Sequence, residues 1–168
     1  VAKGGSVTFD IVLKDPDSTD ALKVVVNWGD GSEPDTYNLP PSSFGLTVQH
    51  TYVDDNPTAT PNDDYTISFA AHDNAGIGAS GTVVVGIENV APAFKTLTDS
   101  TATEQTLWTT EVSFIDPGTD TWVASVDYGD GSGLQKMPVG LNKTLALSHT
   151  YTNAGTYTVH VNVKDDDG

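Results

Sequence analysis

A repeated pattern constrains the fold of this chain more than any other feature. NWGDGS at residues 27–32 recurs as DYGDGS at residues 127–132, and the triplet His-Thr-Tyr follows both, starting at His50 and His149. The order of these motifs is the same in both halves of the chain, and their spacing differs by only one residue. The sequence therefore predicts two related modules in tandem.

The two modules differ by one insertion. The offset between the copies is 99 residues before the segment VDDNPTATPND and 92 after it, so the first copy carries seven additional residues there. We predict one domain at residues 1–88 and a second at 89–168. The first copy continues beyond Asp73 with GIGASGTVVVGIENV, which supplies a closing strand, whereas the second stops at Gly168. The second domain is expected to lack its last strand.

Hydrophobic residues alternate with polar ones along short segments. Val7, Phe9, Ile11 and Leu13 would lie on one face of a strand, because side chains point to opposite faces with a period of two. The same alternation occurs at residues 24–28, 46–48, 65–69, 83–87, 112–114, 124–128, 145–147 and 157–163. Short strands between Gly, Pro, Asn and Asp clusters predict an all-β chain of antiparallel two-sheet sandwiches.

The charge of the chain excludes several partners. Lys and Arg number 7 against 23 Asp and Glu, and the net charge of -16 repels nucleic acid and anionic membrane surfaces. No run of apolar residues is long enough for membrane insertion, and no Cys is present for disulfides or thiolate sites. Cations are the natural ligands of such a chain.

The Gly-Asp-Gly-Ser motif has two readings. Glycines on both sides of an Asp favour a tight turn, whereas Asp30 and Asp130 are alternatively metal ligands or catalytic carboxylates. We favour the turn. His50 and His149 are placed at equivalent strand starts and are expected to form structural hydrogen bonds. The sequence contains no recognisable nucleophile elbow, HExxH motif or phosphate loop, and no enzyme activity is predicted.

Several linked motifs resemble those of polycystic-kidney-disease (PKD) domains. The first copy has WGDGS, HTY, YTI and HDNAG, and the second has DPGTD, VDYGDGS, SHTY, GTYTVHVNV and KDDDG. The resemblance implies two tandem immunoglobulin-like antiparallel β-sandwiches. It also implies non-catalytic modules of large secreted or cell-surface proteins of bacteria and archaea, such as collagenases, chitinases, proteases and adhesin-like repeat proteins.

Acidic residues at strand ends form a candidate calcium site. Asp15 and Asp17 follow the first strand and Asp73 follows a later one, and two such loops can meet at one pole of a sandwich. Calcium prefers six to eight oxygen ligands, and converging acidic loops supply them. The alternative is that these residues are solvated turn residues.

Similar domains of bacterial collagenases bind calcium through an Asp-x-Asp pair, and the resemblance carries this role onto matching positions. The first domain matches at Asp15, Asp17 and Asp73, and the second at Asp116 and Asp165. Gly118 replaces the second Asp of the pair, and Asp120 or the junction residue Asn89 would compensate. A separate acidic cluster in the insertion, residues 54–56 with 63–64, is predicted to be a mobile, solvated loop.

Two functions remain open. The first is a spacer or adhesion module, extracellular or at the cell surface, whose partners are other domains of a parent protein, surface proteins or polysaccharide. The second is an accessory module of a secreted hydrolase that binds carbohydrate or collagen through Trp28, Trp108 or Trp122. The period-two alternation directs these Trp side chains inward, so we favour the spacer or adhesion module.

Overall fold

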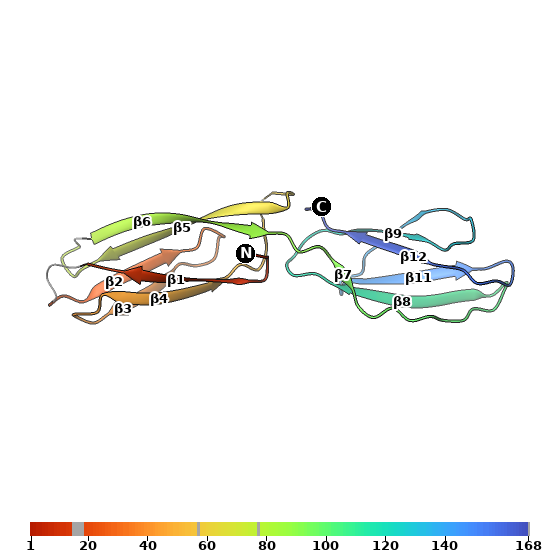
Figure 1. Ribbon diagram of the computed structural model, residues 1–168, viewed down its shortest axis with the longest axis horizontal. Helices are drawn as coiled ribbons and strands as arrows, with labels where there is room; N and C mark the ends of the chain where they lie inside the picture. The colour runs from red at the N-terminus through yellow and green to blue at the C-terminus, as the bar shows by residue number, and fades with distance from the viewer. Residues whose placement is uncertain (15–18, 57, 77, 168) are drawn as a thin grey trace. The chain divides into compact units, whose positions relative to one another are not determined.

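The chain consists of two compact units, Val1–Asn89 and Val90–Gly168. A computed structural model describes residues 1–14, 19–56, 58–76 and 78–167 (Figure 1). These residues form strands and turns, and none of them belongs to a helix that is long and apolar enough to cross a membrane. We refer to the two parts as unit 1 and unit 2.

Unit 1 contains two antiparallel sheets. The larger sheet has the order β3-β2-β5-β6, and the smaller one pairs β1 with β4. Strand β6 is also joined at its end by the N-terminal segment, through a parallel bridge between Ala2 and Glu88. The strands of unit 1 are β1 (Ser6–Val12), β2 (Leu22–Asn27), β3 (Asp35–Leu39), β4 (Gly45–Thr51), β5 (Asn62–His72) and β6 (Gly78–Glu88).

Unit 2 also contains two antiparallel sheets, but its strands are distributed differently between them. One sheet has the order β10-β9-β12 and the other the order β11-β8-β7. Its strands are β7 (Ala93–Phe94), β8 (Leu107–Ile115), β9 (Val123–Asp127), β10 (Gln135–Met137), β11 (Thr144–Thr150) and β12 (His160–Lys164). No strand follows β12 within the part of unit 2 that the structure describes. Both units are immunoglobulin-like all-β sandwiches, as the sequence predicted.

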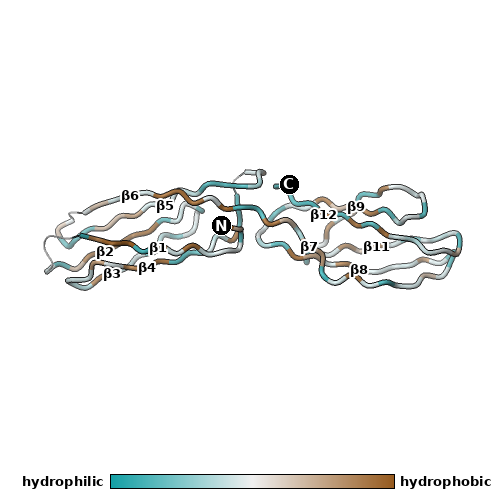
Figure 2. The backbone as a smooth tube through the Cα atoms, viewed as in Figure 1, coloured by the Kyte–Doolittle hydropathy of each residue, from teal (hydrophilic) through white to brown (hydrophobic). Residues whose placement is uncertain are grey.

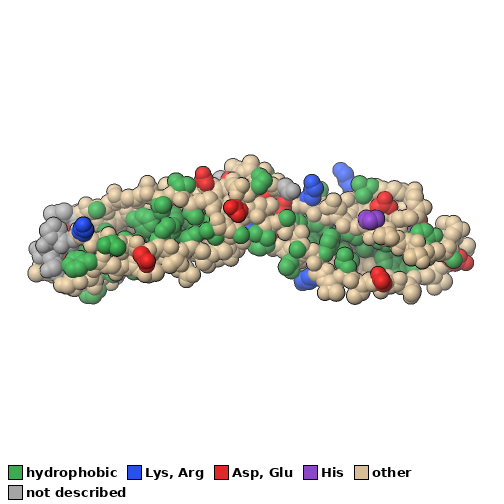
Figure 3. All heavy atoms as spheres, in the orientation of Figure 1, with side chains coloured by type: hydrophobic (Ala, Val, Ile, Leu, Met, Phe, Trp, Pro, Cys, Tyr) green, Lys and Arg blue, Asp and Glu red, His purple; other side chains and the backbone are tan. Residues whose placement is uncertain are grey.

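The core of each unit lies between its two sheets. In unit 1 it includes Trp28, Tyr52 and Ile67, all fully buried, and in unit 2 Tyr128 and Leu145 take part. Figure 2 shows the hydrophobic residues along the strands and hydrophilic turns between them. Figure 3 shows hydrophobic side chains between the sheets of both units. The alternating pattern of the sequence therefore marks the core faces.

Several elements differ from the sequence-based expectation. Strands β3 and β10 were not predicted, because they are short and contain few hydrophobic residues. The His-Thr pairs lie at the ends of β4 and β11, so their placement at strand starts was wrong. Strand β12 begins at His160 and not at the predicted residue 157. Its described pairing is with β9 alone, whereas the first half of β5, the corresponding strand of unit 1, is paired with β6.

Candidate metal centre

The Gly-Asp-Gly-Ser motif is a hydrogen-bonded turn in both units. In unit 2 the Ser132 amide donates to Asp130 Oδ1 at 3.0 Å, and the His149 imidazole Nε2 lies 2.7 Å from Asp130 Oδ2. In unit 1 the Ser32 amide and His50 make the same two contacts with Asp30, also at 3.0 and 2.7 Å. The turn and the histidine hydrogen bonds that the sequence predicted are therefore present in both units.

Each of these histidines is also packed between aromatic rings. His50 stacks on Trp28 with a centroid distance of 4.7 Å and meets the edge of Tyr52 at 5.0 Å. Tyr52 Oη donates to the Trp28 carbonyl at 2.9 Å, and burial, with a smaller effect of the Asp30 charge, raises the pKa of Tyr52 to about 12. The turn aspartates are therefore part of a rigid hydrogen-bonded scaffold, which leaves other carboxylates as candidates for ion binding.

Unit 2 gathers three aspartates at one end of its sheets. Asp116 directly follows β8, Asp165 directly follows β12, and Asp120 lies in the loop between β8 and β9. One carboxylate oxygen of each lies within 4.8 Å of those of the other two. The three residues are only 7%, 8% and 4% exposed, in the order Asp116, Asp120 and Asp165. We call these residues the acidic pole; the structure thus brings together three of the predicted ligands.

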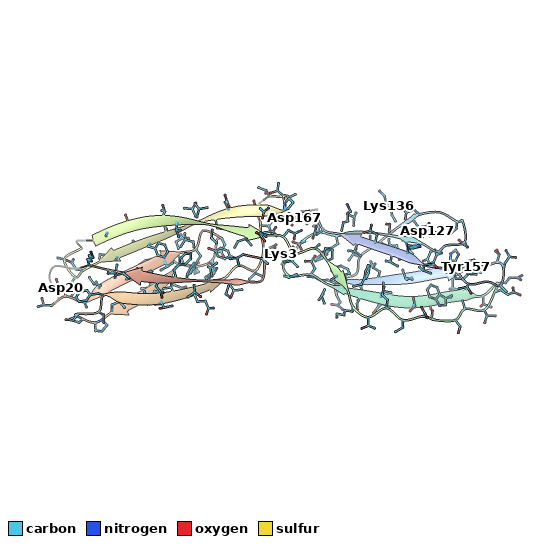
Figure 4. The ribbon with its side chains drawn as sticks, viewed as in Figure 1. Lys3, Asp20, Asp127, Lys136, Tyr157 and Asp167 are labelled. Carbon is cyan, nitrogen blue, oxygen red and sulfur yellow. The ribbon has the colours of Figure 1, made fainter. Side chains whose placement is uncertain are left out.

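Two further carboxylates extend this group. Asp166 and Asp167 lie with Asp120 in a second set whose oxygens are also within 4.8 Å of one another, and Asp167 is 8% exposed (labelled in Figure 4). Asp166 Oδ1 accepts a hydrogen bond from the Thr121 amide at 3.1 Å. Asp166 and Asp167 were not among the ligands predicted from the sequence. The run of three Asp at the end of the chain was the available signal.

A lysine and a tryptophan hold the loop that carries the acidic pole. Lys143 Nζ donates to the carbonyl oxygens of Asp116 and Gly118, and it lies 4.6 Å from the centre of the Trp122 ring. The Trp122 indole N–H donates to Asp116 Oδ2 at 2.5 Å. Gly118 has a φ of 88°, which favours glycine and explains why no second Asp of an Asp-x-Asp pair occurs here.

The arrangement suits a hard cation. Two carboxylates about 5 Å apart repel each other by about 3 kcal/mol at the effective dielectric constant typical of a protein surface. Buried carboxylates also lose hydration, so a group of them without a bound cation raises the free energy of the folded state. A divalent ion with oxygen ligands would reduce both the repulsion and the cost of lost hydration. Calcium takes six to eight oxygen ligands, so backbone carbonyls and water would have to complete its coordination.

The predicted site of unit 1 is described only in part. Asp15 and Asp17 lie outside the described residues. Asp73 follows β5 and is half-buried. Asn89, which was predicted as a compensating ligand of the second domain, is instead the last residue of unit 1, and its backbone amide donates to the Pro61 carbonyl at 2.9 Å. The calcium ligands proposed for this domain therefore remain predictions.

The prediction of a solvated acidic insertion in unit 1 was wrong for Asp55 and Asp63, whereas Asn56 and Asp64 are exposed. Asp55 is fully buried and Asp63 is 6% exposed. Lys3 Nζ lies 3.7 Å from Asp55 Oδ1, and Thr58 donates to both carboxylate oxygens of Asp63 through its amide and hydroxyl groups. Burial raises the pKa of Asp55 and the charge of Lys3 opposes this shift. These two buried aspartates therefore have polar partners that the composition of the insertion does not reveal.

Comparison with known protein families supports the predicted family of the second module. The family model of the PKD domain matches residues 89–168. No curated protein matches the chain. PKD domains are generally non-catalytic immunoglobulin-like modules, and they occur in extracellular proteins. The β-sandwich, the repeated turn and this match agree, and residues 89–168 form a PKD domain.

Proposed function

We propose that the chain is a tandem pair of PKD-type modules that acts as a non-catalytic spacer or adhesion segment of a larger secreted or cell-surface protein, and that calcium stabilises unit 2. The observation that carries the calcium proposal is the acidic pole, with three carboxylates buried within 4.8 Å of one another. An ion that binds only the folded form stabilises it by mass action.

The repetition of detailed contacts supports a second PKD-type module in unit 1. The contact between Asp30 and His50 has the same 2.7 Å length as that between Asp130 and His149. In both units a Tyr hydroxyl then donates to the carbonyl that precedes the Gly-Asp-Gly turn. A shared hydrogen-bond scheme of this kind, in the same chain order, favours two copies of one module.

The placement of the tryptophans favours a spacer or adhesion role over carbohydrate binding. Trp28 is fully buried, and its indole N–H donates to Asp35 at 2.8 Å. Trp122 contacts Lys143 and Asp116, and Trp108 donates to Ser100 at 3.1 Å. Sugar-binding aromatic residues need a free ring face, whereas Trp28 is fully buried and Lys143 lies over the ring of Trp122.

Thermal unfolding of the full chain with calcium and then with a chelator tests the proposal. At a calcium concentration 100 times the dissociation constant, binding adds about 2.7 kcal/mol to the unfolding free energy of unit 2. For a domain of this size that amount corresponds to a rise in Tm of roughly 10–20 °C.

Asp116→Asn and Asp165→Asn should remove most of this rise. Asp99→Asn removes the same charge from an exposed position of unit 2 and should leave the rise intact. Equal midpoints of the wild-type protein in calcium and in chelator would refute calcium stabilisation.

Binding assays separate the two functional classes. The spacer or adhesion proposal expects no retention of the chain on chitin, cellulose or collagen. Retention that Trp122→Ala abolishes would instead support an accessory binding module. The partners expected under our proposal are the neighbouring domains of the parent protein and proteins of the cell surface.

A further inference from the structure

Lys143 is held in place by its backbone. It has a φ of 58°, a left-handed conformation that is uncommon for residues other than glycine. Its amide donates to the Gly140 carbonyl at 3.0 Å, and its carbonyl accepts from the Phe114 amide at 3.0 Å. The residue is thereby fixed between the end of β8 and the start of β11, and its half-buried side chain starts from a defined position.

The side chain of Lys143 reaches the segment that carries the acidic pole. Its ammonium donates to the carbonyl of Asp116 and, at 3.2 Å, to that of Gly118. It also lies over the ring of Trp122, whose N–H binds the Asp116 carboxylate. One positive charge is thus held against the loop that carries Asp116 and Asp120 by two hydrogen bonds to backbone carbonyls and one cation–π contact.

We propose that Lys143 is a tethered counter-cation of the acidic pole, which keeps unit 2 folded when no metal is bound and weakens the binding of calcium to the same carboxylates. Only the second part of this inference, the weakening of calcium binding, rests on the proposed calcium site. An ammonium offsets repulsion among nearby carboxylates, and the same charge repels an incoming divalent ion. Lys143 and calcium therefore stabilise the pole in competition.

Two variants in the full chain test the role of the charge. Lys143→Met should lower the Tm of unit 2 in chelator by roughly 4–8 °C, because one charged anchor is lost. The same change should tighten calcium binding roughly three- to tenfold, since the like charge is gone. Lys143→Arg keeps the charge and should stay close to the wild type in both measurements.

A third variant separates charge from packing. Asp165→Asn removes one carboxylate of the pole, so less repulsion remains for Lys143 to offset. The fall in Tm caused by Lys143→Met should therefore be smaller in the Asp165→Asn background, measured in chelator. A purely structural lysine would give the same fall in both backgrounds.

The outcomes distinguish the two proposals. Wild-type protein that binds no calcium refutes the metal site, while the chelator measurements still decide whether Lys143 is a counter-cation. An unchanged Tm of Lys143→Met in chelator, or an equal loss in the Asp165→Asn background, overturns the counter-cation. Weaker or unchanged calcium binding by Lys143→Met overturns the competition between the two cations.

Discussion

His149 Nε2 lies 2.7 Å from Asp130 Oδ2, and the imidazole stacks on the ring of Tyr128 with a centroid distance of 4.1 Å. This contact joins the end of β11 to the turn after β9. Hydrogen bonds from the Ser132 side chain, His149 and the Ser132 amide together hold the pKa of Asp130 well below its ordinary value of 3.8.

The lowered pKa predicts a pH dependence with a definite sign. A carboxyl group that is more acidic in the folded state stabilises it at a pH above the unfolded pKa, and this contribution is lost as the pH falls through the folded pKa. The wild type should therefore exceed Asp130→Asn in unfolding free energy above about pH 5, and the difference should shrink below about pH 4. Urea midpoints measured across this range check the prediction.

Asp99→Asn is the control for net charge, because Asp99 is exposed in the same unit. It should follow the wild-type curve. A difference between wild type and Asp130→Asn that does not change with pH would show that the carboxylate charge is irrelevant.

Two glycines of one turn should respond differently to alanine. Gly129 and Gly131 both have positive φ angles, of 75° and 85°. A Cβ on Gly129 would lie 2.4 Å from the Thr158 carbonyl oxygen, whereas one on Gly131 meets nothing within 4 Å. Gly131→Ala should cost about 1 kcal/mol through backbone strain, and Gly129→Ala should cost roughly 1–3 kcal/mol more through the clash.

Chemical denaturation of the two variants gives this comparison directly. The described turn of unit 1 offers a second pair, since a Cβ on Gly29 would lie 2.5 Å from the Thr66 carbonyl oxygen, while Gly31 has open space. Equal losses of unfolding free energy at the two glycines of a turn would show that the clash of the Cβ with the carbonyl oxygen has no effect.

The buried pair of Lys3 and Asp55 should show strong coupling. Both side chains are fully buried, and no described residue donates a hydrogen bond to the carboxylate oxygens of Asp55. Figure 4 labels Lys3 on the segment that precedes β1. Removing one charge leaves the other buried, so Lys3→Met alone and Asp55→Leu alone should each cost about 3–5 kcal/mol.

The double variant Lys3→Met/Asp55→Leu should recover most of this loss, because neither charge remains. Hydrogen exchange of β2 and β5 peptides in the full chain reports the stability of unit 1 separately from unit 2. Additive losses in the double variant would mean that the two charges do not stabilise each other.

Trp122 should report calcium binding by its fluorescence. Its indole N–H donates to Asp116 Oδ2 at 2.5 Å, and a calcium ion bound to that carboxylate would change the polarity around the ring. The change in emission on titration with calcium should disappear in Trp122→Phe and persist in Trp108→Phe. A signal that survives in Trp122→Phe would place the ion elsewhere.

The sequence predicts the sandwich because alternation and turn residues are local properties. It also predicts Asp116 and Asp165, since both directly follow strands that the repeat aligns with those before Asp15 and Asp73. Asp120 was only a compensating candidate, and the fold places it with the other two.

The partners of these residues could not be predicted in the same way. Lys143 is 27 positions from Asp116, and Lys3 is even more remote in sequence from Asp55. Such contacts depend on which loops meet at one end of a sheet. The composition of the insertion matched that of a solvated turn, because a buried Asp and an exposed Asp look alike in sequence.

The two units place different rings at the same point of the core. Trp28 donates its indole N–H to Asp35, which lies opposite Val26 across β2 and β3. Tyr128 instead donates to the Ser148 carbonyl, and Gln135 lies opposite Val126. Replacing Trp28 with Tyr, the residue at this position in unit 2, would leave Asp35 without its indole donor. A hybrid module would consequently have to inherit the ring together with its facing strand, so the smallest interchangeable piece of these repeats is a strand pair.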